Sequence, residues 1–160
     1  MFDIVAGYPL YCHYIALISQ FAMFPILATF CSVGVFNAYL LTYLVKDFAY
    51  ETTLVDNVLI AHHIIGIWAT VCFSRSNSET WIITVAEIGS GSYNLYTLAK
   101  AYENNVDAVY AFYAVVMSLS NIYCTISVLR HKTRWYYKVP VLALIIGRQV
   151  FMHQAKGTLD

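Results

Sequence analysis

The segment Ile4–Val45 contains no Asp, Glu, Lys or Arg. A transmembrane helix needs about 20 mostly apolar residues, so this uncharged segment is too long for one span and fits two. Pro25 and the stretch Cys31–Gly34 are the places where we expect the chain to turn or kink, because proline and glycine interrupt regular helix. We therefore predict helices over about residues 8–29 and 32–47. One long broken helix is the alternative.

The whole chain is too apolar for a soluble protein. Residues of the set AVILMFWYC make up 60% of it, charged residues make up 11%, and the mean hydropathy is +0.62. A soluble domain has about 25% charged residues, which it needs to keep its surface wetted. The composition therefore predicts an integral membrane protein. The net charge is zero, which removes the positive field that nucleic-acid binding requires, so no nucleic-acid partner is expected.

Charged breaks divide the remaining sequence into four further apolar stretches. The expected helices cover about residues 55–73, 81–100 and 107–129, and a last one runs from about 137 to Arg148 or His153. The fold class predicted is an all-α, polytopic transmembrane helix bundle of about six spans, with five as the alternative. Because the loops are short, residues 1–160 are expected to form a single transmembrane domain without an extramembrane domain.

The distribution of basic residues predicts an orientation. Arg130, Lys132, Arg134 and Lys138 form the main basic cluster, which should face the cytoplasm or the mitochondrial matrix under the positive-inside rule. Six spans would then place both termini on the opposite side. The first residues contain no Lys or Arg, so a cleavable signal peptide is not expected.

The cysteines lie inside apolar stretches and have no CxxC spacing; they are Cys12, Cys31, Cys72 and Cys124. This pattern indicates neither a zinc site nor a disulfide framework. We expect no metal and no cofactor, and we expect a bound membrane lipid instead.

Polar residues at membrane depth are the most informative ones in such a chain. Glu87, Gly91 and Asn94 share one stripe of the predicted helix 81–100, and Ser90 lies beside it. A charge at the bilayer centre costs at least about 2.5–3.5 kcal/mol, so this stripe should face the bundle interior. It predicts a groove that faces a lipid or a substrate. Close packing of helices through small residues is the alternative.

His62 and His63 are the candidate catalytic residues, and no catalytic role is assigned beyond them. Neighbouring residues on a helix point about 100° apart, so these two imidazoles cannot chelate one ion from the same face. A histidine near Glu87 could serve as a general base, because imidazole titrates near neutrality. The alternative is that both histidines only make hydrogen-bonded helix contacts.

A tyrosine-rich predicted helix ends in an acid at Tyr39–Tyr43–Asp47, and the acid Asp56 precedes the pair His62–His63. The following helix carries Glu87, small residues and Asn94. These three features together resemble the TLC-domain family, the multi-span group that includes ceramide synthases and translocating-chain-associated membrane proteins. The resemblance implies a helical bundle around a lipid-accessible cavity. The residues it marks as lipid-binding are Tyr39, Tyr43, Asp47, Asp56, His62, His63, Glu87, Ser90 and Asn94.

The resemblance favours the branch of the family that lacks ceramide synthase activity. Ceramide synthases follow the histidine pair with a His-Asp-x-x-Asp element, and residues 81–100 contain no His-Asp pair. We therefore expect lipid handling or lipid homeostasis, with membrane lipids as partners and without acyltransferase chemistry. The alternative is a non-catalytic structural subunit of a larger membrane complex, for example an organellar respiratory-type assembly with protein partners. The resemblance implies the endoplasmic reticulum, with the mitochondrial inner membrane or another organelle as the alternative.

Overall fold

The computed structural model describes residues 4–54, 57–73 and 75–157, and it describes no side chains for residues 48–54, 57–59, 72–73 and 156–157. The described chain is all-α except for a short antiparallel hairpin of β1 (Ile4–Val5) and β2 (Tyr8–Pro9). Six helical segments follow the hairpin, so the all-α prediction and the number of helices are confirmed for the described residues. The segments are α1 (Leu10–Ile18) continued by η1 (Ser19–Met23) and α2 (Phe24–Phe30), then α3 (Val33–Leu54), α4 (Asn57–Phe73), α5 (Asn77–Ala101), α6 (Val106–Arg130) and α7 (Trp135–Gly157).

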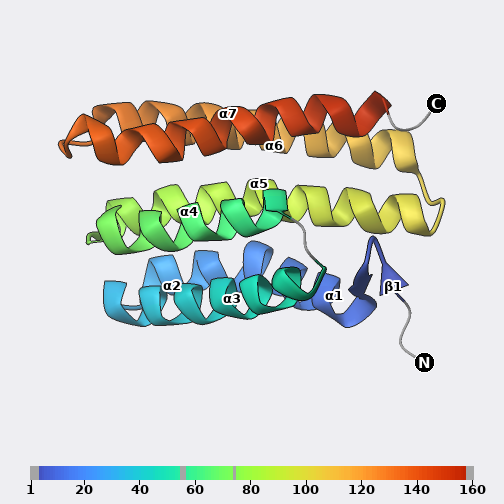
Figure 1. Ribbon diagram of the computed structural model, residues 1–160, viewed down its shortest axis with the longest axis horizontal. Coiled ribbons are helices and arrows are strands. Elements are labelled where there is room, and N and C mark those ends of the chain that lie inside the picture. The colour runs from blue at the N-terminus through green and yellow to red at the C-terminus, as the bar shows by residue number, and fades with distance from the viewer. Residues whose placement is uncertain (1–3, 55–56, 74, 158–160) are drawn as a thin grey trace.

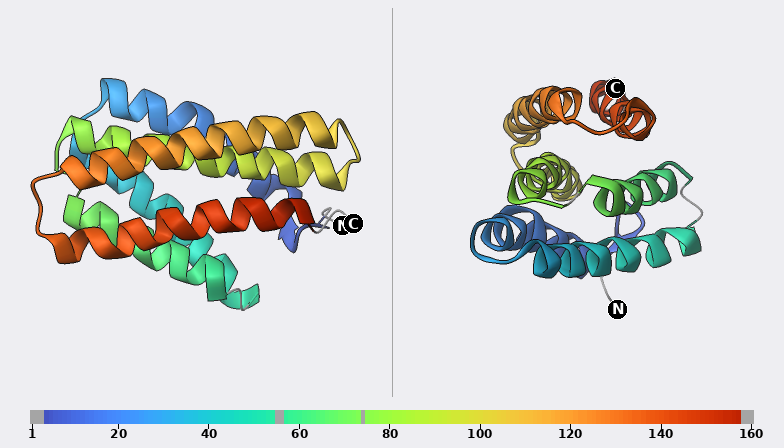
Figure 2. Two further views of the ribbon diagram at one scale, coloured as in Figure 1. Left: turned by 90° about the horizontal axis from the view of Figure 1, so that it is seen from above. Right: turned by 90° about the vertical axis from the view of Figure 1, so that its left-hand side faces the viewer.

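The helices run side by side in three layers of two, as Figure 1 and the end-on view of Figure 2 show. The first layer holds α1–η1–α2 and α3, the middle layer α4 and α5, and the third α6 and α7. Contacts between helices follow a closed ring, because α2 packs on α3, α3 on α4, α4 on α7, α7 on α6, α6 on α5, and α5 on α2. This ring places α4 and α5 opposite each other across the interior.

The first helical segment contains a widened turn just before Pro25. Residues Ser19–Met23 form a π-helical turn, in which the N–H of Phe24 bonds to the carbonyl of Ser19. Proline has no N–H to continue the regular pattern, so the turn before it can widen without losing a further hydrogen bond. The widened turn buries Ser19 and Gln20 inside the bundle. The kink predicted at Pro25 is therefore realised as a local widening, and residues 10–30 remain one continuous helical segment.

Three predicted helix ends are wrong. The helix α3 continues past residue 47 to Leu54, and α5 begins at Asn77 rather than at residue 81. The helix α7 continues to Gly157, past both predicted ends, Arg148 and His153. Lys46 and Asp47 pair with each other at 2.7 Å, so these two charges do not interrupt the helix. Arg148 lies inside α7 and donates a hydrogen bond to a carbonyl of α5, so its charge is accommodated within the bundle.

Two helical segments in the described part of the chain are long and apolar enough to cross a membrane, namely Leu10–Phe30 and Val106–Arg130. A shorter apolar stretch covers Ile60–Val71. The other helices carry more polar and charged residues.

Candidate functional site

A cavity of about 90 Å³ lies in the centre of the ring. Residues of α3, α4, α5, α6 and α7 line it, together with His131 from the loop between α6 and α7. Most of this wall is apolar, since it includes Leu40, Leu44, Ile83 and Leu144. The cavity therefore offers an apolar space that reaches all but the first of the helical segments.

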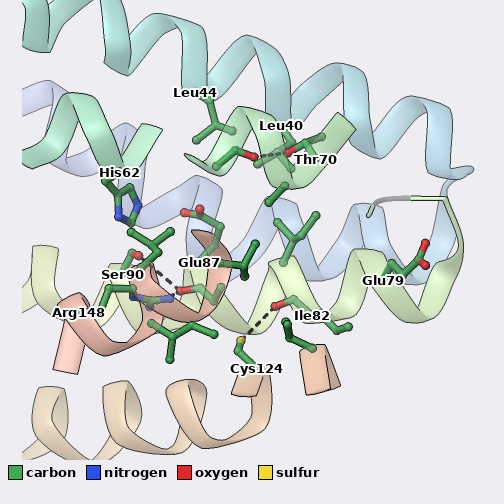
Figure 3. A pocket seen from close by; sticks show the side chains of 18 of the residues that line it. Leu40, Leu44, His62, Thr70, Glu79, Ile82, Glu87, Ser90, Cys124 and Arg148 are labelled. Carbon is green, nitrogen blue, oxygen red and sulfur yellow. Dashed lines mark hydrogen bonds between the residues drawn. The ribbon is translucent and has the colours of Figure 1, made fainter. Parts of the chain in front are cut away.

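Polar side chains gather at one end of the cavity. Figure 3 shows His62, Glu87, Ser90 and Arg148 close together, while Glu79 lies at the other end. They come from three different helices, α4, α5 and α7. A mostly apolar space with a few converging polar groups is the usual form of a ligand site.

Arg148 is held against α5. Its Nη2 donates to the carbonyl of Ala86 at 2.7 Å and contacts the sulfur of Met117 at 3.3 Å. A Cβ atom at Gly89 would lie 2.5 Å from the same nitrogen and 2.7 Å from the hydroxyl of Ser120. Gly89 therefore makes room for the guanidinium, and any side chain there would displace it or Ser120.

A chain of hydrogen bonds joins Glu87 to the N-terminal hairpin. Gln20 donates from Nε2 to Glu87 at 3.1 Å, and Asn94 donates from Nδ2 to the Oε1 of Gln20 at 2.9 Å. His13 contacts the Oδ1 of Asn94 through Nδ1 at 3.3 Å and the carbonyl of Val5 through Nε2 at 2.9 Å. His13, Gln20 and Glu87 are all buried. The chain thus runs from the cavity to one end of the bundle without leaving the interior.

Glu79 and His131 close the other end of the cavity. The two side chains form a hydrogen-bonded ion pair, and the N–H of Arg75 donates to Glu79 at 2.5 Å. Glu79 lies in the first turn of α5, before the predicted span begins at residue 81. Burial acts to raise the pKa of Glu79, but the hydrogen bonds from Arg75, His131 and Ser76 outweigh it and hold the pKa below its ordinary value. This contact ties the start of α5 to the loop after α6.

The structure divides the sequence-predicted lipid-binding residues into two groups. His62, Glu87 and Ser90 line the cavity, whereas Asn94 lies behind Glu87 and contacts it only through Gln20. The other described members lie on the contact of α3 with α2 and α4, away from the cavity wall; they are Tyr39, Tyr43, Asp47 and His63. Asp56 lies outside the described residues.

The residues of the second group pack helices together. Tyr39 hydrogen-bonds to Ser19 at 2.8 Å, and both Tyr39 and Tyr43 place their rings edge-on against Phe24 at 5.4 Å. The Nε2 of His63 lies 3.9 Å from a carboxylate oxygen of Asp47, which connects α4 to α3. The two neighbouring histidines therefore face different surroundings, as their helical spacing predicts: His62 faces the cavity and His63 faces α3.

Sequence reasoning missed Gln20 and Arg148 as members of this site. Gln20 lies inside an uncharged segment, where a buried primary amide is a signal that a polar partner lies across the helix interface. Arg148 is one of the two ends predicted for the last helix, and His153 is the other. Arg148 follows the apolar run Val141–Ile146, and an arginine that continues an apolar helix is the same kind of signal, because at membrane depth it faces a polar partner or a cavity.

Within the described residues, no group of three or more His, Cys, Asp or Glu side chains is placed to hold a metal ion. Comparisons with protein-family models, with curated proteins and with solved structures found no match.

Proposed function

We propose that this chain is an integral membrane protein whose six helices span the bilayer and enclose a lipid-binding cavity. The outward faces support this proposal. On α6, Val115, Leu119 and Ile122 are each more than half exposed, at 58%, 62% and 57%. A soluble protein rarely exposes a large continuous apolar surface, whereas a bilayer solvates one. The apolar helices Leu10–Phe30 and Val106–Arg130 fit the same environment.

The observation that carries the proposal is the central cavity, apolar along most of its wall and polar at one end. An amphipathic molecule has the same division, with an apolar tail and a polar head. His62, Glu87 and Arg148 would contact the head, and the leucines and isoleucines of α3, α5 and α7 would contact the tail. Binding and handling of a membrane lipid is therefore the function that this geometry supports best.

The contacts at the cavity favour binding over covalent chemistry. The Ser90 hydroxyl donates to the carbonyl of Ala86 at 3.4 Å, and the Cys124 thiol donates to the carbonyl of Ile82 at 3.5 Å. Neither nucleophile is hydrogen-bonded to a histidine in these contacts, and an activated nucleophile needs an adjacent base. We therefore propose a lipid-handling protein resembling the TLC-domain members without ceramide synthase activity, resident in the endoplasmic reticulum.

Native mass spectrometry of the gently solubilised protein tests this proposal, combined with identification of the lipids it releases. The decisive comparison is Ala69→Phe, which fills the cavity wall on α4, against Ala61→Phe, which adds the same ring on the exposed face of that helix. We expect bound lipid in the wild type and in Ala61→Phe, and its loss in Ala69→Phe. Equal lipid retention in all three proteins would contradict the proposal.

The same measurement tests the structural-subunit alternative. A subunit of a larger complex would appear as a multi-chain assembly, and its assembly would depend on outward-facing residues. If Ala69→Phe lost its bound lipid while the multi-chain assembly stayed unchanged, lipid binding and assembly would be separate properties of the chain.

A further inference from the structure

Arg148 is the only lysine or arginine among the described residues that line the cavity. Its Nη2 is engaged by Ala86 and Met117. Its other two guanidinium nitrogens, Nε and Nη1, form no hydrogen bond with the described part of the chain, and Arg148 forms no ion pair there. The guanidinium is thus held through Nη2, and its Nε and Nη1 can donate hydrogen bonds to a ligand.

The surroundings of Arg148 hold this geometry. The guanidinium sits over Gly89, where a Cβ atom would come within 2.5 Å of Nη2. An arginine held in this way has already lost much of its side-chain freedom, so a ligand does not need to order it. A planar guanidinium with a free edge fits the two oxygens of a carboxylate or a phosphate.

The charge balance of the cavity points to an anionic ligand. A cation at membrane depth is costly unless it is paired. The nearest acid on the cavity wall is Glu87, but its Oε2 accepts from Gln20 and it is not ion-paired with Arg148 within the described residues. His62 and Cys124 are further titratable side chains of the described cavity wall, and neither is ion-paired with Arg148. An anion on Arg148 would supply the missing partner.

The size of the cavity limits the rest of the ligand. A cavity of about 150 Å³ holds a single benzene molecule, so a space of about 90 Å³ accommodates only a few carbon atoms next to the head. Beyond Arg148 the wall consists of apolar side chains such as Leu40, Leu44 and Ile145. The cavity is partly open, so it fits the first carbons of one hydrocarbon chain, and the rest of a longer chain would lie outside it.

We propose that Arg148 binds the anionic head, a carboxylate or a phosphate monoester, of a single-chain amphiphile whose first carbons lie in the cavity and whose remaining tail extends beyond it. This inference rests on the proposed lipid-binding function and names the class of lipid. Glu87 lies on the same cavity, and in its ionised form it would repel such a head. Neutralising Glu87 should therefore strengthen binding, whereas neutralising Arg148 should weaken it.

Isothermal titration of the full-length protein in an uncharged detergent tests this assignment, with empty micelles as the partition reference. The probes share one tail and differ in the head: dodecanoate, dodecyl phosphate, dodecylamine and dodecanol. We expect the two anionic probes to bind best. Arg148→Gln should weaken them about 10- to 100-fold, because charge-assisted hydrogen bonds are lost. Arg134→Gln is the matched control, since Arg134 is exposed and contacts Tyr136.

Glu87→Gln is the second variant, and it keeps the size of the side chain and its contact with Gln20. We expect it to bind dodecanoate about 3- to 10-fold more tightly, because the repulsion is removed. If dodecylamine instead bound best to the wild type, and Glu87→Gln abolished that binding, the assignment would be overturned in favour of a cationic head. Equal binding of dodecanoate to the wild type and to Arg148→Gln would also overturn it while leaving lipid binding intact. If Ala69→Phe removes no bound lipid either, the proposed function itself fails.

Discussion

Gln20 donates a hydrogen bond to Glu87 at 3.1 Å although 67 positions separate them in the chain. The contact depends on the π-helical turn Ser19–Met23, which carries Gln20, and on Gly91, where a Cβ atom would lie 3.1 Å from the Cβ of Gln20. The widened turn before Pro25 and the absence of a side chain at Gly91 together allow the amide of Gln20 to reach the carboxyl group of Glu87.

We predict that Gln20→Leu destabilises the fold. The substitution leaves the buried Glu87 and Asn94 without their shared partner, and an unsatisfied buried polar group costs about 1–3 kcal/mol. The measurement is the thermal unfolding midpoint in detergent, followed by tryptophan fluorescence. Gln154→Leu, at an exposed position of α7, is the control and should change little. Equal midpoints for both variants would show that the amide chain contributes nothing to stability.

A second prediction concerns Asn94, the other amide of this chain. Asn94→Leu removes the hydrogen bond that Asn94 donates to Gln20 at 2.9 Å and its contact with His13, so it should lower the unfolding midpoint as Gln20→Leu does. The double variant Gln20→Leu/Asn94→Leu should lower the midpoint by less than the sum of the two single variants, because both residues belong to one chain of hydrogen bonds. Additive changes would refute the coupling of the two amides.

The third prediction uses the glycines of the chain as matched probes. Gly89→Ala should destabilise the protein by about 1–3 kcal/mol, because the added methyl group collides with Arg148 and Ser120 and overpacking strains the neighbours. Gly147→Ala adds the same group where no atom lies within 4 Å, so it should be neutral or stabilising. A comparison of unfolding midpoints checks both. Equal destabilisation would indicate a general effect of glycine replacement in helices.

The sequence predicts where the helices lie in the chain better than it predicts which helices pack against each other. Apolar runs of helical length mark six helices. Charged breaks separate most of them, and the first two are divided at the uncharged stretch Cys31–Gly34. The partner of each helix depends on isolated contacts such as Gln20 with Glu87 and Arg148 with Ala86. Such contacts have no local pattern, since helices in an apolar bundle have several nearly equivalent faces.

The candidate site was predictable to a similar extent. The cost of burying a charge places Glu87 inside the bundle without any knowledge of its neighbours. The same reasoning does not distinguish His62 from His63, because both belong to one apolar helix and only the position of α3 decides which of them reaches the cavity. Arg148 lies near the end of the last predicted helix, where an arginine also fits a membrane boundary, and its inward direction follows only from the ring of helices.

A fourth prediction follows from the ion pair at the far end of the cavity. Because the pKa of Glu79 is lower in the folded protein than its ordinary value of 4.5, its contribution to stability is present above that value and is lost as the pH falls through the folded-state pKa. The unfolding midpoint should therefore drop in this acidic range, and Glu79→Gln should show a smaller drop. Glu103→Gln, in the exposed turn between α5 and α6, is the control. An unchanged pH profile in Glu79→Gln would assign the acid sensitivity to other carboxyl groups.

The last prediction concerns the orientation of the bundle in the membrane. The end of the bundle where α5 begins and α6 ends carries a group of basic residues: Arg75, Arg130, Lys132, Arg134 and Lys138. At the opposite end, Lys100 lies in the last turn of α5, the described turn between α5 and α6 carries Glu103, and Asp107 follows in the first turn of α6. Positive loops remain on the cytoplasmic or matrix side, so we expect the basic end to face that side.

Single cysteines introduced into a cysteine-free variant test this orientation. Ser78→Cys lies at the basic end and Asn104→Cys at the opposite end, and both positions are exposed. A membrane-impermeant maleimide applied to sealed vesicles with the cytoplasmic or matrix face outward should label the first variant and spare the second until detergent is added. Labelling of both variants would show that the two ends do not lie on opposite sides of the membrane, which contradicts the six-span proposal. Labelling of the second variant alone would retain the spans and reverse the orientation.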